Sequence, residues 1–142
     1  MNPSEIKVCQ EEIKDLLKKG LIEPSKSEWA CRGFYVNKHS EQKRGNMRLV
    51  VNYLLLNATL QPIRYPFPNK SSLLQRIKDK TTFNKFDLKF EFYQKAIIYE
   101  DRYKTDFVVP HGHYQWKVMP FGLKNAPGEF HKRMEDNYRE LT

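Results

Sequence analysis

The sequence predicts an α+β fold in which helices and an antiparallel sheet share one core. Segments with apolar residues at helical spacing alternate with segments in which every second residue is apolar. The 142 residues suffice for one domain or for a piece of a larger one. With 13% aromatic and 30% charged residues, the chain is too aromatic for a disordered tail and too polar for a membrane protein.

The N-terminal part predicts a helix over residues 5–19 and then a β-hairpin. Apolar side chains recur at helical spacing after Ser4, the expected N-cap, and Gly20 stands where a left-handed residue would close the helix. Residues 34–36 and 47–53 are rich in β-branched and aromatic side chains. The polar stretch between them contains Lys43, Arg44 and Gly45, so the hairpin has a basic tip.

The middle of the chain predicts a short helix and a strand. The helix, about residues 70–79, follows Asn69 as N-cap and has Leu73, Leu74 and Ile77 on one face. The strand lies within residues 83–90, where apolar and polar residues alternate. Asp87 falls on the polar side of this half-buried strand.

The C-terminal part predicts a two-stranded ribbon and a final helix. Residues 103–109 and 114–119 alternate in the manner of strands and flank a turn at residues 110–113. Phe130, Met134, Tyr138 and Leu141 recur at helical spacing, and Pro127 suits the first position of a helix that runs to the end.

The two cysteines, Cys9 and Cys31, are too few for a disulfide framework or a four-cysteine zinc site. The N-terminus lacks the layout of a signal peptide, and no apolar run approaches the roughly 18–20 residues of a membrane span. We therefore expect reduced cysteines in an intracellular protein of the cytoplasm or nucleus that is neither secreted nor inserted in a membrane.

The charge balance indicates a polyanionic partner. The chain has 25 Lys and Arg against 17 Asp and Glu, a net charge of +8. Such an excess is typical of nucleic-acid binding, in which cations displace condensed counterions from phosphates. On charge alone, a merely basic solvated surface is an equally good interpretation.

Two groups of side chains could bind a metal ion, and for both a simpler interpretation is favoured. His111 and His113 lack a carboxylate or cysteine cluster to complete a ligand set, and histidines are common in turns beside Pro and Gly. Glu100, Asp101 and Asp106 are interleaved with basic residues, which is typical of a solvated face.

Four blocks resemble the reverse transcriptase domain of plant pararetroviruses (caulimovirus-like) and gypsy-type retrotransposons. They read RLVVNY at 48–53, FDLK at 86–89, YKT at 103–105 and MPFGLKNAP at 119–127. The last block is too long and specific to arise by chance. The form GHYQWKV at 112–118 is closer to the pararetroviral pattern than to the retrotransposon pattern. The resemblance covers nearly the whole chain.

The resemblance implies an incomplete right-hand polymerase that consists of fingers and a partial palm. The fingers would comprise about residues 1–62 and 95–125, and the palm about 63–94 and 126–142. Such an enzyme adds a dNTP to the primer of an RNA or DNA primer–template, using two divalent ions. By this resemblance, Asp87 is the first catalytic aspartate, and it binds Mg²⁺ together with the backbone carbonyl of Leu88.

The resemblance also implies four nucleotide-binding residues. Arg48 matches the fingers arginine that grips the triphosphate, for which a guanidinium fork is well suited. Lys38 matches a fingers lysine with the same partner, although the neighbouring loop differs in length from relatives and leaves Lys43 as an alternative. Phe92 matches the aromatic gate against a ribose 2′-hydroxyl, and Phe121 matches a position in the nucleotide pocket.

Several departures from the family pattern bear on activity. The sequence contains no Tyr-x-Asp-Asp motif, which in relatives supplies the other metal carboxylates, and no thumb, connection or ribonuclease H segment. Residues unusual for the family occupy a further set of positions: Leu54, Leu55, Phe90, Glu91, Lys95 and Asp106. We therefore expect a degenerate endogenous copy that is inactive on its own. The alternative is a non-catalytic, basic nucleic-acid-binding remnant.

Overall fold

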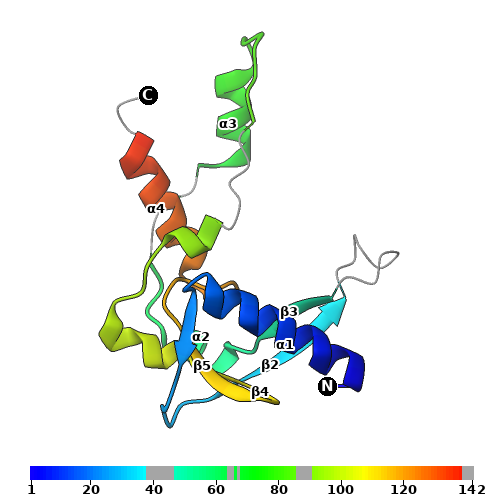
Figure 1. The fold of residues 1–142 in the computed structure, drawn as a ribbon. Coiled ribbons are helices and arrows are strands. Elements are labelled where there is room, and N and C mark those ends of the chain that lie inside the picture. Colours follow the sequence, from blue (N-terminus) through cyan, green and yellow to red (C-terminus); the bar gives the residue numbers. More distant parts are fainter. Residues whose placement is uncertain (38–46, 64–65, 67, 86–90, 139–142) are drawn as a thin grey trace.

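In the computed structural model, which describes residues 1–37, 47–63, 66, 68–85 and 91–138, a mixed sheet packs with helices (Figure 1). The helices are α1 (Pro3–Lys18), α2 (Leu54–Thr59), α3 (Lys70–Ile77) and α4 (Ala126–Tyr138), with 3₁₀ helices η2 (Glu91–Gln94) and η3 (Tyr99–Thr105). The strands are β1 (Ile22–Pro24), β2 (Cys31–Asn37), β3 (Met47–Val51), β4 (Phe107–Val109) and β5 (Gly112–Trp116). The predicted α+β class is confirmed.

The sheet has the strand order β1-β5-β4-β2-β3. The predicted hairpin is confirmed, because β2 and β3 pair antiparallel with Phe34 opposite Val50. The predicted ribbon is confirmed as the antiparallel pair β4 and β5. Strand β2 also pairs parallel with β4, Cys31 opposite Phe107, and this pairing joins the hairpin to the ribbon.

Helix α1 begins earlier than predicted, because Asn2 rather than Ser4 is its N-cap. The Asn2 side chain accepts the backbone N–H of Glu5 at 2.8 Å, and the Glu5 carboxylate accepts the N–H of Asn2 at 2.9 Å. The Ser4 hydroxyl donates to the Asn2 side chain instead. This reciprocal pair satisfies two amide groups that would otherwise lack partners at the helix start.

The end of α1 matches the prediction for Gly20. Its φ of +69° is in the left-handed region, which favours glycine. The N–H groups of Gly20 and Leu21 donate to the carbonyls of Leu17 and Leu16, both at 3.0 Å. These two hydrogen bonds close the helix, and the chain then turns into β1.

The core lies between α1 and the sheet. Helix α1 places Cys9, Ile13 and Leu16 in it. The other buried members come from the strands and α2: Ile22, Val51, Tyr53, Leu56, Phe107, Val109 and Trp116. Cys9 and Cys31 are free, as expected, and burial raises the pKa of both thiols.

The chain before β4 differs from the prediction of a strand over residues 103–109. Residues 99–105 form η3, and β4 begins only at Phe107. The Thr105 hydroxyl donates to the Arg102 carbonyl at 2.7 Å and accepts the Trp116 N–H at 3.0 Å. These two bonds stabilise a turn where side-chain alternation had indicated a strand. Strand β5 likewise ends at Trp116 rather than at residue 119.

The predicted strand at 47–53 is also shorter than expected, because β3 ends at Val51. The Asn52 side chain accepts the N–H of Leu54 at 3.1 Å and turns the chain into α2. The predicted strand at 83–90 is not formed at residues 83–85, and the rest of it lies outside the described residues.

The predicted helices α3 and α4 are confirmed with small changes. Asn69 caps α3, since its side chain accepts the Ser71 N–H at 2.9 Å. Helix α3 stands away from the sheet and has no buried residue (Figure 1). Helix α4 begins at Ala126, so Pro127 is its second residue rather than its first. Within the described ranges, no helix is long and apolar enough to span a bilayer.

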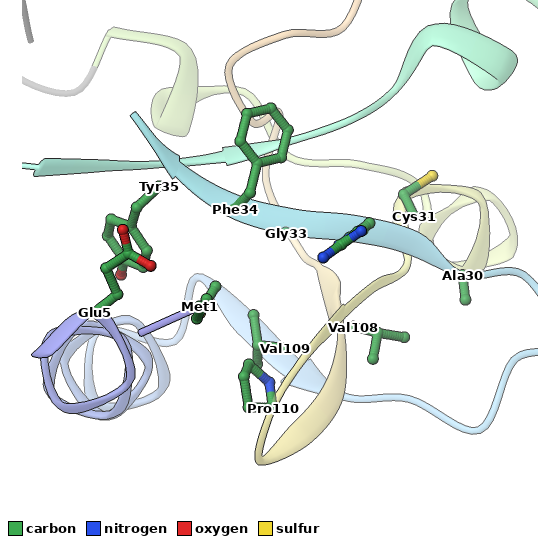
Figure 2. A pocket seen from close by; sticks show the side chains of 11 residues that line it. Met1, Glu5, Ala30, Cys31, Gly33, Phe34, Tyr35, Val108, Val109 and Pro110 are labelled. Atoms are coloured by element: carbon green, nitrogen blue, oxygen red, sulfur yellow. The ribbon is translucent and has the colours of Figure 1, made fainter. Parts of the chain in front are cut away.

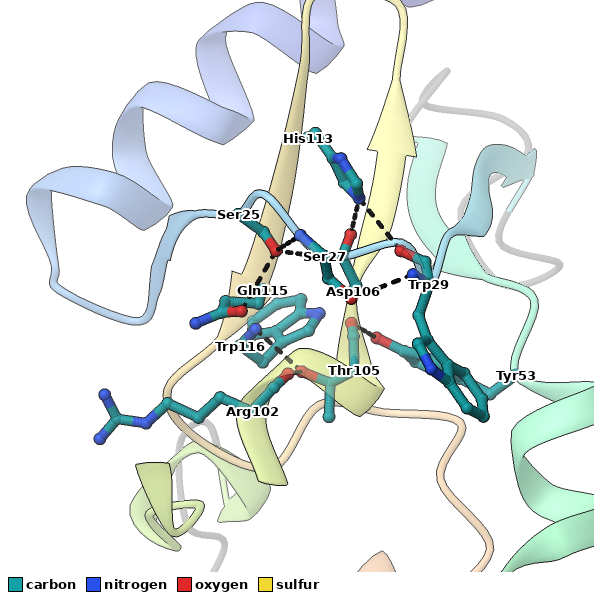
Figure 3. A network of polar contacts seen from close by, with 10 residues as sticks. All are labelled: Ser25, Ser27, Trp29, Tyr53, Arg102, Thr105, Asp106, His113, Gln115 and Trp116. Atoms are coloured by element: carbon teal, nitrogen blue, oxygen red, sulfur yellow. Dashed lines mark hydrogen bonds and ion pairs between the residues drawn. The ribbon is translucent and has the colours of Figure 1, made fainter. Parts of the chain in front are cut away.

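Asp106, predicted to lie on a solvated face, is instead fully buried at the start of β4 (Figure 3). One carboxylate oxygen accepts a hydrogen bond from the Ser25 hydroxyl. The other faces the Nε2 atom of His113 on β5, which also contacts the Trp29 carbonyl at 3.2 Å. The prediction failed because both partners of the carboxylate come from other segments of the chain.

Burial raises the pKa of Asp106 above its ordinary value of 3.8, and the Ser25 bond and the charge of His113 oppose this rise. The carboxyl group therefore holds its proton more tightly in the folded chain than in the unfolded chain. Its contribution to stability is fully present below pH 3.8 and is lost as the pH rises through the folded pKa.

We predict that Asp106→Asn removes this pH dependence, because the amide cannot ionise and its oxygen still accepts the Ser25 hydroxyl. The variant should gain stability relative to the original chain as the pH rises from about 4 to about 7. Urea unfolding of both proteins at several pH values measures the difference. Asp79→Asn, at an exposed carboxylate, is the control. If the difference in stability between the original chain and Asp106→Asn stayed the same at every pH, the prediction would be contradicted.

Candidate nucleotide site

The structure describes two of the predicted site residues with their side chains, Arg48 and Phe121. Arg48 is an exposed residue of β3, and Phe121, 44% exposed, lies in the connection between β5 and α4. Phe92 lies in η2, but its side chain is outside the description. Lys38, Asp87 and Leu88 lie outside the described residues, so their predicted roles stay predictions.

Tyr93 of η2 contacts Phe121 and was missed by the sequence analysis. Its ring stacks on Trp116, with centroids 5.4 Å apart and planes at 29°. It also meets the ring of Phe121 edge to face at 5.7 Å and 62°. The only available signal was its place directly after Phe92 in the sequence.

Arg48 acts electrostatically on the hydroxyl group of Tyr93. The pKa of Tyr93 is raised to about 12, chiefly by burial of the hydroxyl and secondly by the negative charge of Glu12. Arg48 lowers it, which means that the positive charge of Arg48 acts on the Tyr93 hydroxyl. We call Arg48, Tyr93 and Phe121 the aromatic–arginine cluster.

The aromatic–arginine cluster offers two kinds of contact to a ligand. A guanidinium group binds anionic oxygens through several parallel N–H donors. An exposed aromatic ring such as Phe121 offers a flat apolar surface to a base or a sugar. The combination suits a ligand with both a phosphate group and a planar ring.

Residues that depart from the family pattern are accommodated in different ways. Lys95 forms an ion pair with Glu129 of α4 at 3.4 Å. Asp106 is buried in the polar network described above. Leu54 and Leu55 at the start of α2 are 74% and 84% exposed, an unusual state for two adjacent leucines. The side chains of Phe90 and Glu91 lie outside the description.

A cavity of about 560 Å³ lies elsewhere, between the start of α1 and the strands β2 and β4 (Figure 2). Its walls include Met1, Glu5, Arg32, Phe34 and Val109. No member of the aromatic–arginine cluster lines it, so the cavity and the cluster are separate features.

Metal binding finds no support among the side chains that the structure describes, where no three His, Cys, Asp or Glu residues gather. In particular, the ring of His113 is engaged by Asp106. The predicted Mg²⁺ ligands, Asp87 and the carbonyl of Leu88, lie in the stretch 86–90, where the structure is not described. Their oxygen atoms are of the type that Mg²⁺ prefers.

Comparison with solved structures gives the fold. The structure aligns with a prototype foamy virus protease–reverse transcriptase (CSH mutant) at a TM-score of 0.80 and 25% identity, over 100% of this chain and 19% of that chain. A foamy viral protease–reverse transcriptase in complex with an RNA/DNA hybrid aligns with a TM-score of 0.80 and 21% identity, over 99% of this chain and 18% of that one.

Comparison with curated proteins gives the family branch. The genome polyprotein of Petunia vein clearing virus (isolate Hohn) is 51% identical over 134 residues, which are 94% of this chain and 6% of the polyprotein. The enzymatic polyprotein of Cauliflower mosaic virus (strain NY8153) is 41% identical over 138 residues, 97% of this chain and 20% of the polyprotein. The chain thus spans only a small part of these relatives, and the predicted resemblance to plant pararetroviruses is confirmed.

The family profile described as reverse transcriptase (RNA-dependent DNA polymerase) matches residues 36–142, three quarters of the chain. This range includes Arg48, Tyr93 and Phe121, so the aromatic–arginine cluster lies within the matched region. The chain belongs to the reverse transcriptase family.

Proposed function

We propose that this chain is the part of an RNA-directed DNA polymerase that receives the incoming dNTP. The observation that carries the proposal is the packing of Phe121 against Tyr93, on whose hydroxyl the charge of Arg48 acts, since Arg48 and Phe121 come from distant blocks of the sequence. In this proposal the fingers comprise about residues 1–62 and 95–125, and the palm about 63–94 and 126–142.

Each residue of the site has a distinct role in this proposal. The guanidinium group of Arg48 binds the triphosphate, assisted by Lys38. The ring of Phe121 packs against the nucleotide, and the bulk of Phe92 excludes a ribose 2′-hydroxyl. Tyr93 supports Phe121 from the protein side. Asp87 and the carbonyl of Leu88 would hold Mg²⁺, which when bound stabilises negative charge on phosphate oxygens.

The proposed partner of the chain is a primer–template. Foamy viral protease–reverse transcriptases with the same fold have been solved in complex with double-stranded DNA and with an RNA/DNA hybrid. The net charge of +8 favours a polyanion of this kind. The hairpin between β2 and β3, whose tip contains Lys43 and Arg44, is the proposed basic contact.

We further propose that these 142 residues do not catalyse nucleotide addition by themselves. They contain no Tyr-x-Asp-Asp motif to complete a set of metal carboxylates around Asp87. The second candidate function, a non-catalytic nucleic-acid-binding remnant of an endogenous copy, is favoured by Phe90 and Glu91, which depart from the family pattern, together with the basic charge.

We predict that Arg48→Ala weakens dNTP binding about tenfold, the loss typical of a hydrogen bond to a charged group. A titration of a fluorescent dNTP analogue into the chain measures the affinity. Arg32→Ala on β2 is the matched control, because Arg32 lines the separate cavity. If the Arg48 variant and the original chain bound the dNTP analogue with equal affinity, the proposed nucleotide site would be refuted.

Primer extension tests the proposed lack of activity. The chain and its Asp87→Asn variant are incubated with a primed homopolymer RNA template, dNTP and Mg²⁺. We expect no extension by either protein. Extension by the original chain that the substitution abolishes would show that other groups replace the missing carboxylates, and the proposed inactivity would be wrong.

Salt dependence tests nucleic-acid binding by the basic hairpin. We predict similar affinities for single-stranded and duplex DNA, both of which fall steeply as salt rises. The double variant Lys43→Ala/Arg44→Ala should reduce the slope of log affinity against log salt by about 2. The control is Lys18→Ala/Lys19→Ala at the end of α1. A sequence-specific affinity that does not depend on salt would contradict the prediction.

A further inference from the structure

The loop that presents Phe121 has an unusual backbone. It follows β5, which ends at Trp116, passes through Gly122 and Lys124, and enters α4 at Ala126. Gly122 has a φ of +96°, a conformation that residues with a Cβ rarely adopt. A loop of this kind needs partners for its backbone groups if it is to hold one conformation.

Asn57 of α2 supplies two of these partners with a single side chain. Its amide nitrogen donates to the Gly122 carbonyl at 2.8 Å. Its amide oxygen accepts the backbone N–H of Lys124 at 2.8 Å. Among side chains of this length, only asparagine offers both a donor and an acceptor in one plane, and aspartate offers acceptors alone.

Asn125, a residue of the loop, likewise uses its side chain to bond two backbone groups of the segment that follows α2. Its amide nitrogen donates to the Gln61 carbonyl at 2.9 Å, and its oxygen accepts the Ile63 N–H at 3.3 Å. The loop is thus fastened to the α2 region at two places, by one asparagine from each side. We call Asn57 and Asn125 the asparagine clamp.

The asparagine clamp is anchored in the core through Tyr53. The backbone N–H of Asn57 donates to the Tyr53 carbonyl at 2.7 Å. The ring of Tyr53 is 2% exposed, and its hydroxyl donates to the Thr105 carbonyl at 2.8 Å. The position of Asn57 is therefore set by buried structure and not by the exposed loop itself.

We propose that Asn57 is a positioning residue for the nucleotide pocket. By fixing the backbone at Gly122 and Lys124, it keeps the preceding residue, Phe121, against the ring of Tyr93 at 5.7 Å. The effect on nucleotide affinity rests on the proposed function, whereas the effect on the loop does not.

Nuclear magnetic resonance of the 142-residue chain tests the loop directly. The variants are Asn57→Ala, Asn57→Asp and, as matched control, Asn52→Ala, whose side chain binds the Leu54 N–H instead. The readouts are hydrogen exchange at the Lys124 amide and the nuclear Overhauser effects from Tyr93 to Phe121 and to Trp116. The Tyr93 to Trp116 effect reports whether the core is intact.

For Asn57→Ala we expect at least tenfold faster exchange at Lys124 and loss of the Tyr93 to Phe121 effect, with the Tyr93 to Trp116 effect retained. In Asn57→Asp, the Lys124 amide should stay protected from exchange, because the carboxylate still accepts its N–H. The Tyr93 to Phe121 effect should weaken, because the carboxylate cannot donate to the Gly122 carbonyl. Asn52→Ala should resemble the original chain. Unchanged exchange and an unchanged Tyr93 to Phe121 effect in Asn57→Ala would overturn the proposal. Should Asn57→Ala not fold, the Tyr93 to Phe121 effect in Asn57→Asp decides, and an unchanged effect there would overturn the proposal.

A dNTP titration of the same variants separates this proposal from the proposed function. We expect at least fivefold weaker binding for Asn57→Ala and no change for Asn52→Ala. If the original chain binds no dNTP, the proposed function fails, and the resonance data alone decide whether Asn57 positions Phe121. If Asn57→Ala loosens the loop but binds dNTP with full affinity, the role of Asn57 in the pocket is refuted.

Discussion

The ring of Trp116 contacts two other aromatic rings, and the core and the candidate site both depend on these contacts. Phe107, fully buried in β4, lies at 5.7 Å from it, and Tyr93 lies at 5.4 Å. The backbone N–H of Trp116 also binds the hydroxyl of Thr105. Because Tyr93 supports Phe121, the packing of the sheet determines where the exposed ring of the site lies. The site thus needs little scaffold of its own.

Local signals explain which elements could be predicted. Gly20 and Asn69 mark helix ends through their own backbone and side-chain chemistry, so the sequence around them was sufficient. The segment before β4 lacked such a signal, because alternating apolar residues are compatible with a strand as well as with the turn that forms. The hydroxyl of Thr105 decides between them by binding Trp116, eleven residues further along the chain.

In the candidate site, too, local motifs could be predicted from the sequence, whereas contacts between distant segments could not. Arg48 and Phe121 could be named because they stand in motifs that resemble a known family, but the contact of Phe121 with Tyr93 depends on tertiary packing. Asp106 was misread for a related reason. Its neighbours in sequence are charged, whereas the groups that permit its burial, Ser25 and His113, come from other segments. Burial of a carboxylate can be predicted only when its hydrogen-bonding partners are known, and the periodicity of the sequence does not identify these partners.

The strand order also dictates when the sheet can close. In the described sheet, β1 pairs with β5, and β2 pairs with β4 across roughly 75 intervening residues. Both pairings can therefore form only after β4 and β5 have been synthesised. At ribosomal rates of about 5–20 residues per second, the delay is several seconds. During that time the β2–β3 hairpin can form, but its inner edge and the apolar face of α1 stay uncovered. Until the chain has been synthesised as far as Trp116, these uncovered surfaces stay open to aggregation.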